Sequence, residues 1–169
     1  MLFYSRTTTP RRAVPLGLLA LAELRRRRPG VQIELFGDPR GAGALFEHRD
    51  LGVLAPDELA RAYNRATVGM VLSMTNYSLI GQEMLACGLP CVELDTPSTR
   101  AALGGAGAAE LSAFRVDALA SALERLLTDP ELREERRAAG LKLVRERTWA
   151  TAAEQVEAGL REGLRLAAE

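Results

Sequence analysis

Apolar residues follow two different spacings along this chain, and the two spacings alternate. Short, nearly continuous apolar runs predict buried strands, whereas apolar positions that recur every three or four residues predict helices. Strands are expected over residues 2–5, 31–36, 50–54, 68–72, 91–94 and 109–114. Helices are expected over residues 14–28, 56–66, 79–87, 116–127, 132–143 and 149–167. Such alternation is typical of βαβ units, so we expect an α/β fold in which helices cover both faces of a parallel sheet.

Residues 68–95 form the most sharply defined unit: a strand, a polar turn, a helix and a second strand. With about 100° of rotation per residue, Glu83 falls between Leu79 and Cys87 on the apolar face of this helix. A carboxylate on such a face is expensive to bury without a partner. We therefore expect Glu83 to face a cleft near the start of the helix.

The turns at the carboxyl ends of the strands carry the candidate chemistry. In open parallel sheets these turns share one rim, where ligands bind. Arg6 and Arg11, in the first turn, can present guanidinium groups to phosphate, and the helix that begins near Ser78 directs free N–H groups at the same rim. Glu83 can accept two hydrogen bonds from a sugar diol. Surface cations and a solvated glutamate would explain each residue singly, but together these residues indicate a nucleotide or a nucleotide sugar.

Composition narrows the class of partner. The 22 basic and 22 acidic residues balance, which argues against a domain dedicated to nucleic acid or to an anionic membrane. The arginines at residues 25–28 are therefore interpreted as a solvated helix end rather than a nucleic-acid patch. Cys87 and Cys91 show no metal or redox spacing, and no apolar run reaches the roughly 18 residues of a membrane helix. We expect reduced cysteines and a cytoplasmic location.

Several motifs, in their order and spacing, resemble the C-terminal, donor-binding domain of GT-B glycosyltransferases of the family-4-like group. EMLACGLP at residues 83–90 is similar to the family's EAMACGLP. LGVLAPDELARAYNRA at residues 51–66 is similar to its LG-x-V…ELA-x-LY segment, whose loop contacts the nucleobase. IELFG at residues 33–37 and DPELR at residues 129–133 resemble two further stretches. The resemblance covers about residues 2–155 and implies a Rossmann-like parallel sheet that forms one half of a GT-B fold.

The resemblance also implies roles for residues along the rim. Arg6 and Arg11 match the Arg…Lys pair that holds the donor diphosphate, and Glu83 matches the glutamate that binds the ribose. The family has another glutamate eight positions earlier, for the donor sugar, where this chain has Thr75, and Thr96-Pro97-Ser98 replaces its Gly-Gly. RTTTPRR at residues 6–12 and SMTNYSLIGQEMLACG at residues 73–88 look more like rhamnosyltransferase-type members of the family, which build bacterial surface glycans. The implied donor-binding residues are Arg6, Arg11, Gly37, Val53, Thr75, Tyr77, Ser78, Leu79, Ile80 and Glu83.

By the same resemblance, the reaction is a metal-independent transfer with a nucleoside-diphosphate sugar as donor substrate and no cofactor. Arg6, Arg11 and the backbone N–H groups of residues 78–80 would stabilise the departing diphosphate. No catalytic residue is assigned in this domain, because the acceptor site and any general base of GT-B enzymes usually belong to the N-terminal domain. His48, the only histidine, is interpreted as a surface residue.

The resemblance further implies that the chain is part of a longer protein. Residues 1–169 would form a single nucleotide-sugar-binding domain whose partner is an N-terminal acceptor-binding domain, and alone would transfer little or no sugar. The helix at residues 149–167 is expected either to pack toward that domain or to lie on the core of this one. The full-length enzyme could associate peripherally with a membrane, and no nucleic acid is expected. A non-enzymatic nucleotide-binding or interaction module and a sugar-nucleotide epimerase half-domain stay open as alternatives.

Overall fold

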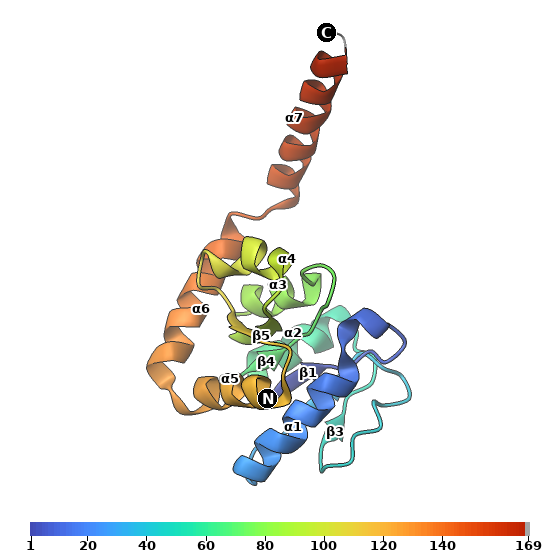
Figure 1. Ribbon diagram of the computed structural model, residues 1–169, viewed down its shortest axis with the longest axis vertical. Helices are drawn as coiled ribbons and strands as arrows, with labels where there is room; N and C mark the ends of the chain where they lie inside the picture. Colours follow the sequence, from blue (N-terminus) through green and yellow to red (C-terminus); the bar gives the residue numbers. More distant parts are fainter. Residues whose placement is uncertain (168–169) are drawn as a thin grey trace.

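The computed structural model describes residues 1–167 and contains a six-stranded parallel sheet with the strand order β3-β2-β1-β4-β5-β6 (Figure 1). The strands are β1 (Leu2–Tyr4), β2 (Glu34–Phe36), β3 (Arg49–Asp50), β4 (Gly69–Met70), β5 (Cys91–Leu94) and β6 (Glu110–Ser112). The predicted parallel α/β fold is confirmed. The chain proceeds outward from β1 to β3 and then returns to the centre at β4. The strand order therefore reverses between β1 and β4, which is where sheets of this type bind ligands.

Helices cover both faces of the sheet, as the sequence predicted. One face carries α1 and α5, and the other carries α2, α3 and α6. The helical segments are η1 (Pro10–Arg12), α1 (Val14–Arg27), α2 (Pro56–Arg65), α3 (Leu79–Ala86), α4 (Pro97–Thr99), the π-helical η2 (Arg100–Gly104), α5 (Val116–Thr128), α6 (Pro130–Arg145) and α7 (Trp149–Ala167).

Alternate strand residues divide the core into two layers, because successive side chains of a strand point to opposite faces. Phe3 and Val92 belong to the layer under α1 and α5, whereas their neighbours Leu2 and Cys91 belong to the layer under α2 and α3. Gly17 lets α1 approach the sheet closely, since a Cβ atom at this position would collide with the ring of Phe3. The sheet is thus buried on both faces, and only its rim is left for ligands.

The strands are shorter than the apolar runs predicted. Residues 68–72 are all buried, yet only Gly69–Met70 is assigned as β4. The strand expected over residues 50–54 is wrong in position, because β3 lies at the edge of the sheet and ends at Asp50. Gly52, with φ of 64°, turns the chain away from the sheet just afterwards. Apolar character therefore located the buried segments but not their hydrogen-bonded lengths.

The arginines at residues 25–28 end α1 and are engaged in ion pairs. Their carboxylate partners come from the same helix, from the loop before β3 and from α5: Glu23, Glu47 and Glu124. Arg27 also donates to the hydroxyl of Ser121 at 2.9 Å. These contacts fasten the end of α1 to its neighbours, as expected of a structural helix end.

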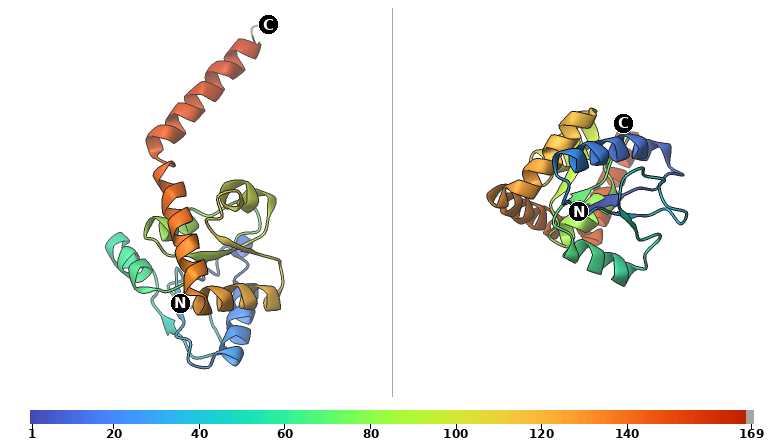
Figure 2. Two further views of the ribbon diagram at one scale, coloured as in Figure 1. Left: turned by 90° about the vertical axis from the view of Figure 1, so that its left-hand side faces the viewer. Right: turned by 90° about the horizontal axis from the view of Figure 1, so that it is seen from below.

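The last helix, α7, projects away from the body of the domain (Figures 1 and 2). It contains no buried residue, and its apolar residues Trp149, Leu160 and Leu164 are 85%, 65% and 74% exposed. Of the two alternatives expected for this helix, the one in which it lies on the core of the same domain is therefore contradicted. Among the helices of residues 1–167, none has the length and apolar character required to span a bilayer.

Candidate functional site

The turns that follow β1 and β4 meet where the strand order reverses. The backbone N–H of Met74, in the turn after β4, donates to the carbonyl oxygen of Arg11 at 2.9 Å. Arg11 lies in η1, which forms part of the turn after β1. The side chains of Arg6 and Arg11 are both exposed, so two guanidinium groups are available to an anion at this rim.

The turn after β1 is held in place by Asp38, which follows β2. Its carboxylate accepts hydrogen bonds from the backbone N–H of Thr7 at 3.1 Å, from the hydroxyl of Thr7, and from the backbone N–H of Arg40 at 3.0 Å. These hydrogen bonds, led by that from the Thr7 hydroxyl, lower the pKa of Asp38 below its ordinary value. Asp38 therefore stays ionised at neutral pH and fixes the backbone next to Arg6.

The start of α3 lies directly after the turn that follows β4. Ser78 caps the helix and is 3% exposed, with its hydroxyl oxygen accepting from the backbone N–H of Ile80 at 3.2 Å. The Gly81 N–H donates to the carbonyl oxygen of Ser78 at 3.1 Å, so among the described residues the N–H groups of Ser78 and Leu79 are left without a partner at the positive dipole end of the helix. The start of α3 follows the turn that holds Met74, and the anion site expected there stays a prediction.

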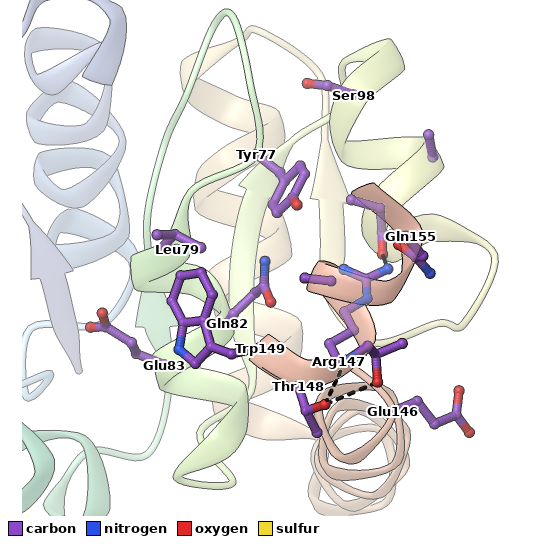
Figure 3. Close-up of a pocket in the computed structure, with 14 residues that line it drawn as sticks. Tyr77, Leu79, Gln82, Glu83, Ser98, Glu146, Arg147, Thr148, Trp149 and Gln155 are labelled. Carbon is purple, nitrogen blue, oxygen red and sulfur yellow. Dashed lines mark hydrogen bonds between the residues drawn. The ribbon is translucent and has the colours of Figure 1, made fainter. Parts of the chain in front are cut away.

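A cavity of about 840 Å³ opens beside α3 and contains three of the predicted residues, Tyr77, Leu79 and Glu83. Its other walls come from α4, η2 and the junction of α6 with α7 (Figure 3). The sequence reasoning noted Ser98 in the segment that replaces the family's Gly-Gly, but it did not assign to the site Gln82 of α3 or the residues from the α6–α7 junction, which include Arg147, Thr148, Trp149 and Gln155. No signal in the sequence could have shown that the start of α7 lines a cavity beside α3, because the two are more than sixty residues apart.

Glu83 lies on the exposed face of α3. The expectation that it shares a buried apolar face is wrong, because the buried residues of α3 are Gly81, Met84 and Leu85, and Leu79 is itself 59% exposed. The expectation of a nearby cleft agrees with the cavity, which Glu83 lines. Its Oε2 atom accepts a hydrogen bond from the hydroxyl of Tyr63 at 3.2 Å, a contact that sequence reasoning missed.

The other predicted residues lie around the rim but do not line the cavity. Gly37 has φ of 100°, and a Cβ atom there would collide with the ring of Tyr4, so the position requires glycine. Its N–H donates to the carbonyl of Gly52 at 2.7 Å, which places it near Val53, 68% exposed. Thr75 is exposed and donates from its hydroxyl to the side-chain oxygen of Asn76 at 3.1 Å.

Beneath the rim lies a buried polar group that the sequence reasoning also missed. Glu93 of β5 is fully buried, and neither of its carboxylate oxygens has a hydrogen-bond partner among the described residues. Burial raises the pKa of Glu93 to about 8, although the charge of Arg12 acts in the opposite direction. The guanidinium of Arg12 lies 5.5 Å from the ring centre of Tyr4. A glutamate inside the otherwise apolar strand CVEL was the available signal.

His48 lies away from this rim, in the loop before β3. Its Nδ1 and Nε2 atoms lie 2.7 Å from the Phe46 carbonyl and 3.3 Å from an Asp50 carboxylate oxygen. Within residues 1–167 no three His, Cys, Asp or Glu side chains gather in a way that could hold a metal ion.

Comparison with known proteins gives one matching family model, described as glycosyl transferase-like, over residues 11–158. The O-antigen biosynthesis protein RfbC of Myxococcus xanthus is 34% identical over 103 residues, which cover 58% of this chain and 8% of that protein. The D-inositol 3-phosphate glycosyltransferase of Corynebacterium diphtheriae is 32% identical over 165 residues, covering 83% of this chain and 37% of that protein.

A similar fold is found in the solved structure of HepE from Anabaena in complex with UDP and glucose. It superposes with a TM-score of 0.77 at 15% identity, covering 95% of this chain and 48% of that one. The chain therefore spans less than half the length of each of these three proteins.

Proposed function

We propose that this chain, which belongs to the glycosyl transferase-like family, is the part of a glycosyltransferase that binds the nucleoside-diphosphate sugar donor. The observation that carries the proposal is the grouping of an anion site and a carboxylate at one rim. The start of α3 and the exposed Arg6 and Arg11 offer positive charge, and Glu83 lies on the same helix beside an open cavity. HepE, which has a similar fold, was solved with UDP and glucose.

Each part of the donor then has a partner. Arg6, Arg11 and the N–H groups at the start of α3 bind the diphosphate, and Glu83 accepts hydrogen bonds from the ribose hydroxyls. Gly37 and Val53 lie near the nucleobase, and Tyr77 and Thr75 lie toward the sugar. As the bond to the sugar breaks, the diphosphate gathers negative charge, and donors already fixed around it lower the barrier. The scheme needs neither a metal ion nor a cofactor.

The sugar acceptor requires a second domain. We expect an N-terminal, acceptor-binding domain in the full-length enzyme, because the family members compared above are more than twice as long as this chain. The projecting helix α7, with its exposed apolar residues, is the element that would contact it. The isolated chain is then expected to bind donor and transfer little or no sugar. We expect a glycan acceptor and a cytoplasmic enzyme that can associate with the membrane surface.

Thr75 is the observation that favours a second candidate. A side chain without charge stands where the resembling enzymes carry a glutamate for the donor sugar, and its hydroxyl is engaged with Asn76. A domain that binds nucleotide but does not orient a sugar would be a non-enzymatic nucleotide-binding module. The two candidates differ in one measurement, the gain in affinity when a sugar is attached to the nucleoside diphosphate.

Calorimetric titration of the chain with UDP, GDP, dTDP and their sugar conjugates tests the proposal. We expect one base to bind with a Kd below the millimolar range and its sugar conjugate to bind at least as tightly. Binding of the nucleotide with a large loss of affinity for every conjugate would favour the module instead. No binding by any of these compounds at millimolar concentration would contradict the donor site itself.

A further inference from the structure

Tyr63 is anchored in the layer of the core under α2 and α3. The residue is 2% exposed, and its ring packs edge-on against Phe36 with the ring centres 5.9 Å apart. Phe36 in turn packs against Tyr4 at 5.2 Å. The three rings form a continuous row from β1 through β2 to α2, so the ring of Tyr63 has little freedom to move.

The hydroxyl of Tyr63 reaches out of this row to α3, where it donates to the Oε2 atom of Glu83 at 3.2 Å. A buried hydroxyl needs a hydrogen-bond partner, and Glu83 supplies it. Burial, reinforced by the negative charge of Glu83, raises the pKa of Tyr63 well above its ordinary value. Tyr63 therefore keeps its proton and acts as a donor throughout the pH range in which proteins are stable.

Glu83 does not need this bond for its own solvation, because it is exposed on the surface of α3. A free glutamate at such a site samples many rotamers, and fixing one on binding a ligand costs about 0.5 to 1.5 kcal/mol. The bond from Tyr63 fixes the carboxylate in advance. It occupies one acceptor position of Oε2 and leaves the whole of Oε1 and the second lone pair of Oε2 available.

We propose that Tyr63 is a positioning residue, which holds the Glu83 carboxylate ready for two adjacent hydroxyl groups and so sets selectivity for a ribonucleotide over one without a 2′,3′-diol. The inference rests on the proposed donor-nucleotide function and adds to it a residue that never touches the ligand. Because the rigid aromatic row carries Tyr63, the selectivity is built into the core of the domain rather than into a loop.

The experiment compares UDP and GDP with their 2′,3′-dideoxy counterparts, using Tyr63→Phe in the 169-residue chain. Phenylalanine keeps the ring packing and removes only the hydroxyl. We expect the preference for the ribonucleotide to fall by about 3- to 10-fold, the range set by the cost of ordering one side chain, while affinity for the dideoxy nucleotide stays the same. Tyr4→Phe, which removes another hydroxyl from the same aromatic row, is expected to leave the preference unchanged.

A double-mutant cycle with Glu83→Ala separates positioning from a general loss of structure. If Tyr63 acts through Glu83, Tyr63→Phe has no further effect on the preference once Glu83 has been removed. An equal effect in both backgrounds overturns the inference, as does an unchanged preference in the single variant. If the unaltered chain binds both forms of the nucleotide equally, the diol role of Glu83 fails and the inference with it, but the donor-nucleotide function stands. Only the absence of all nucleotide binding removes both.

Discussion

Two glutamates ten positions apart, Glu83 on α3 and Glu93 on β5, lie in opposite surroundings. Glu83 is exposed beside a cavity and accepts a hydrogen bond from Tyr63. Glu93 is fully buried, and both of its carboxylate oxygens lack hydrogen-bond partners among residues 1–167. Water can solvate the exposed carboxylate of Glu83, yet it has a hydrogen-bond partner in the protein. The carboxylate of Glu93 is shielded from water and has no such partner among the described residues.

The difference separates a residue suited to binding from one that limits stability. A carboxylate that is held in place and open to solvent can exchange water for ligand hydroxyls at small cost. Burial without hydrogen bonds disfavours the ionised form of a carboxyl group, and for this reason the pKa of Glu93 rises to about 8. We therefore expect substitutions at Glu83 to alter ligand affinity and substitutions at Glu93 to alter folding.

The largest effect is expected from Glu93→Gln on the free energy of unfolding. The folded pKa of Glu93, about 8, lies above its ordinary value of 4.5, so the folded state binds the proton more tightly than the unfolded state. The stability contributed by the protonated group is complete below pH 4.5 and is lost as the pH rises through about 8, by roughly 5 kcal/mol at most. Glutamine carries no such proton, and the variant should lose this pH dependence and gain stability at pH 8.

Urea unfolding at pH 5.5, 7 and 8.5 measures this effect. Glu83→Gln removes one formal charge from the neighbouring element and serves as the control for net charge. Arg12 and Cys91 are the ionisable groups whose charges interact with Glu93, so Arg12→Met should steepen the pH dependence. Equal slopes for the unaltered chain and Glu93→Gln would show that Glu93 is satisfied in solution, and the contrast with Glu83 would disappear.

The next effect is that of Glu83→Ala on nucleotide binding. Hydrogen bonds to a charged group contribute about 1.5 to 3 kcal/mol each, so we expect the affinity for a nucleoside diphosphate to fall by about 10- to 100-fold. Pyrophosphate has no diol, and its affinity should be unchanged. Calorimetric titration with both ligands makes the comparison, and equal losses for the two would contradict the role assigned to Glu83.

The contrast between the two glutamates also shows how far sequence reasoning reached. The alternating pattern predicted the sheet and the helices on both of its faces. The type of each element can be predicted because it depends on the spacing of apolar residues that are close together along the chain. Glu83 could be singled out from its motif, but its exposure could not, since the periodicity placed it on an apolar face whose members include the exposed Leu79. Local period predicts which residues share a face and not what covers that face.

Contacts between distant segments explain what was missed. The hydrogen bond from Tyr63 to Glu83 joins α2 to α3, and Trp149 from the start of α7 lines the cavity beside α3. No sequence pattern around Tyr63 or Trp149 predicts that either residue lies near Glu83. The two alternatives for α7 could likewise not be separated, because an amphipathic stripe on a helix predicts a covering surface without saying whether that surface belongs to the same domain.

A smaller effect is expected from Arg6→Ala, which tests the anion site without touching either glutamate. Arg6 is exposed, so its attraction for phosphate is partly screened by solvent and salt. We expect the affinities for pyrophosphate and for the nucleoside diphosphate to fall by the same factor, about 3- to 10-fold, with less loss at high salt. Arg26→Ala, at the far end of α1, is the matched control. A loss confined to the nucleotide would place Arg6 at the base or ribose instead.

The smallest effect on folding is expected from Trp149→Ala. Trp149 lines the same cavity as Glu83 but is 85% exposed, and α7 has no buried residue. Substitutions at such sites usually change the free energy of unfolding by no more than about 0.5 kcal/mol, despite the size of the indole ring. Urea unfolding of the 169-residue chain provides the measurement, with Leu164→Ala, 74% exposed and farther along α7, as a companion variant. A loss above about 1 kcal/mol for Trp149→Ala alone would mean that the start of α7 closes over α3 in solution, and Glu83 would then share with Glu93 a covered rather than an open environment.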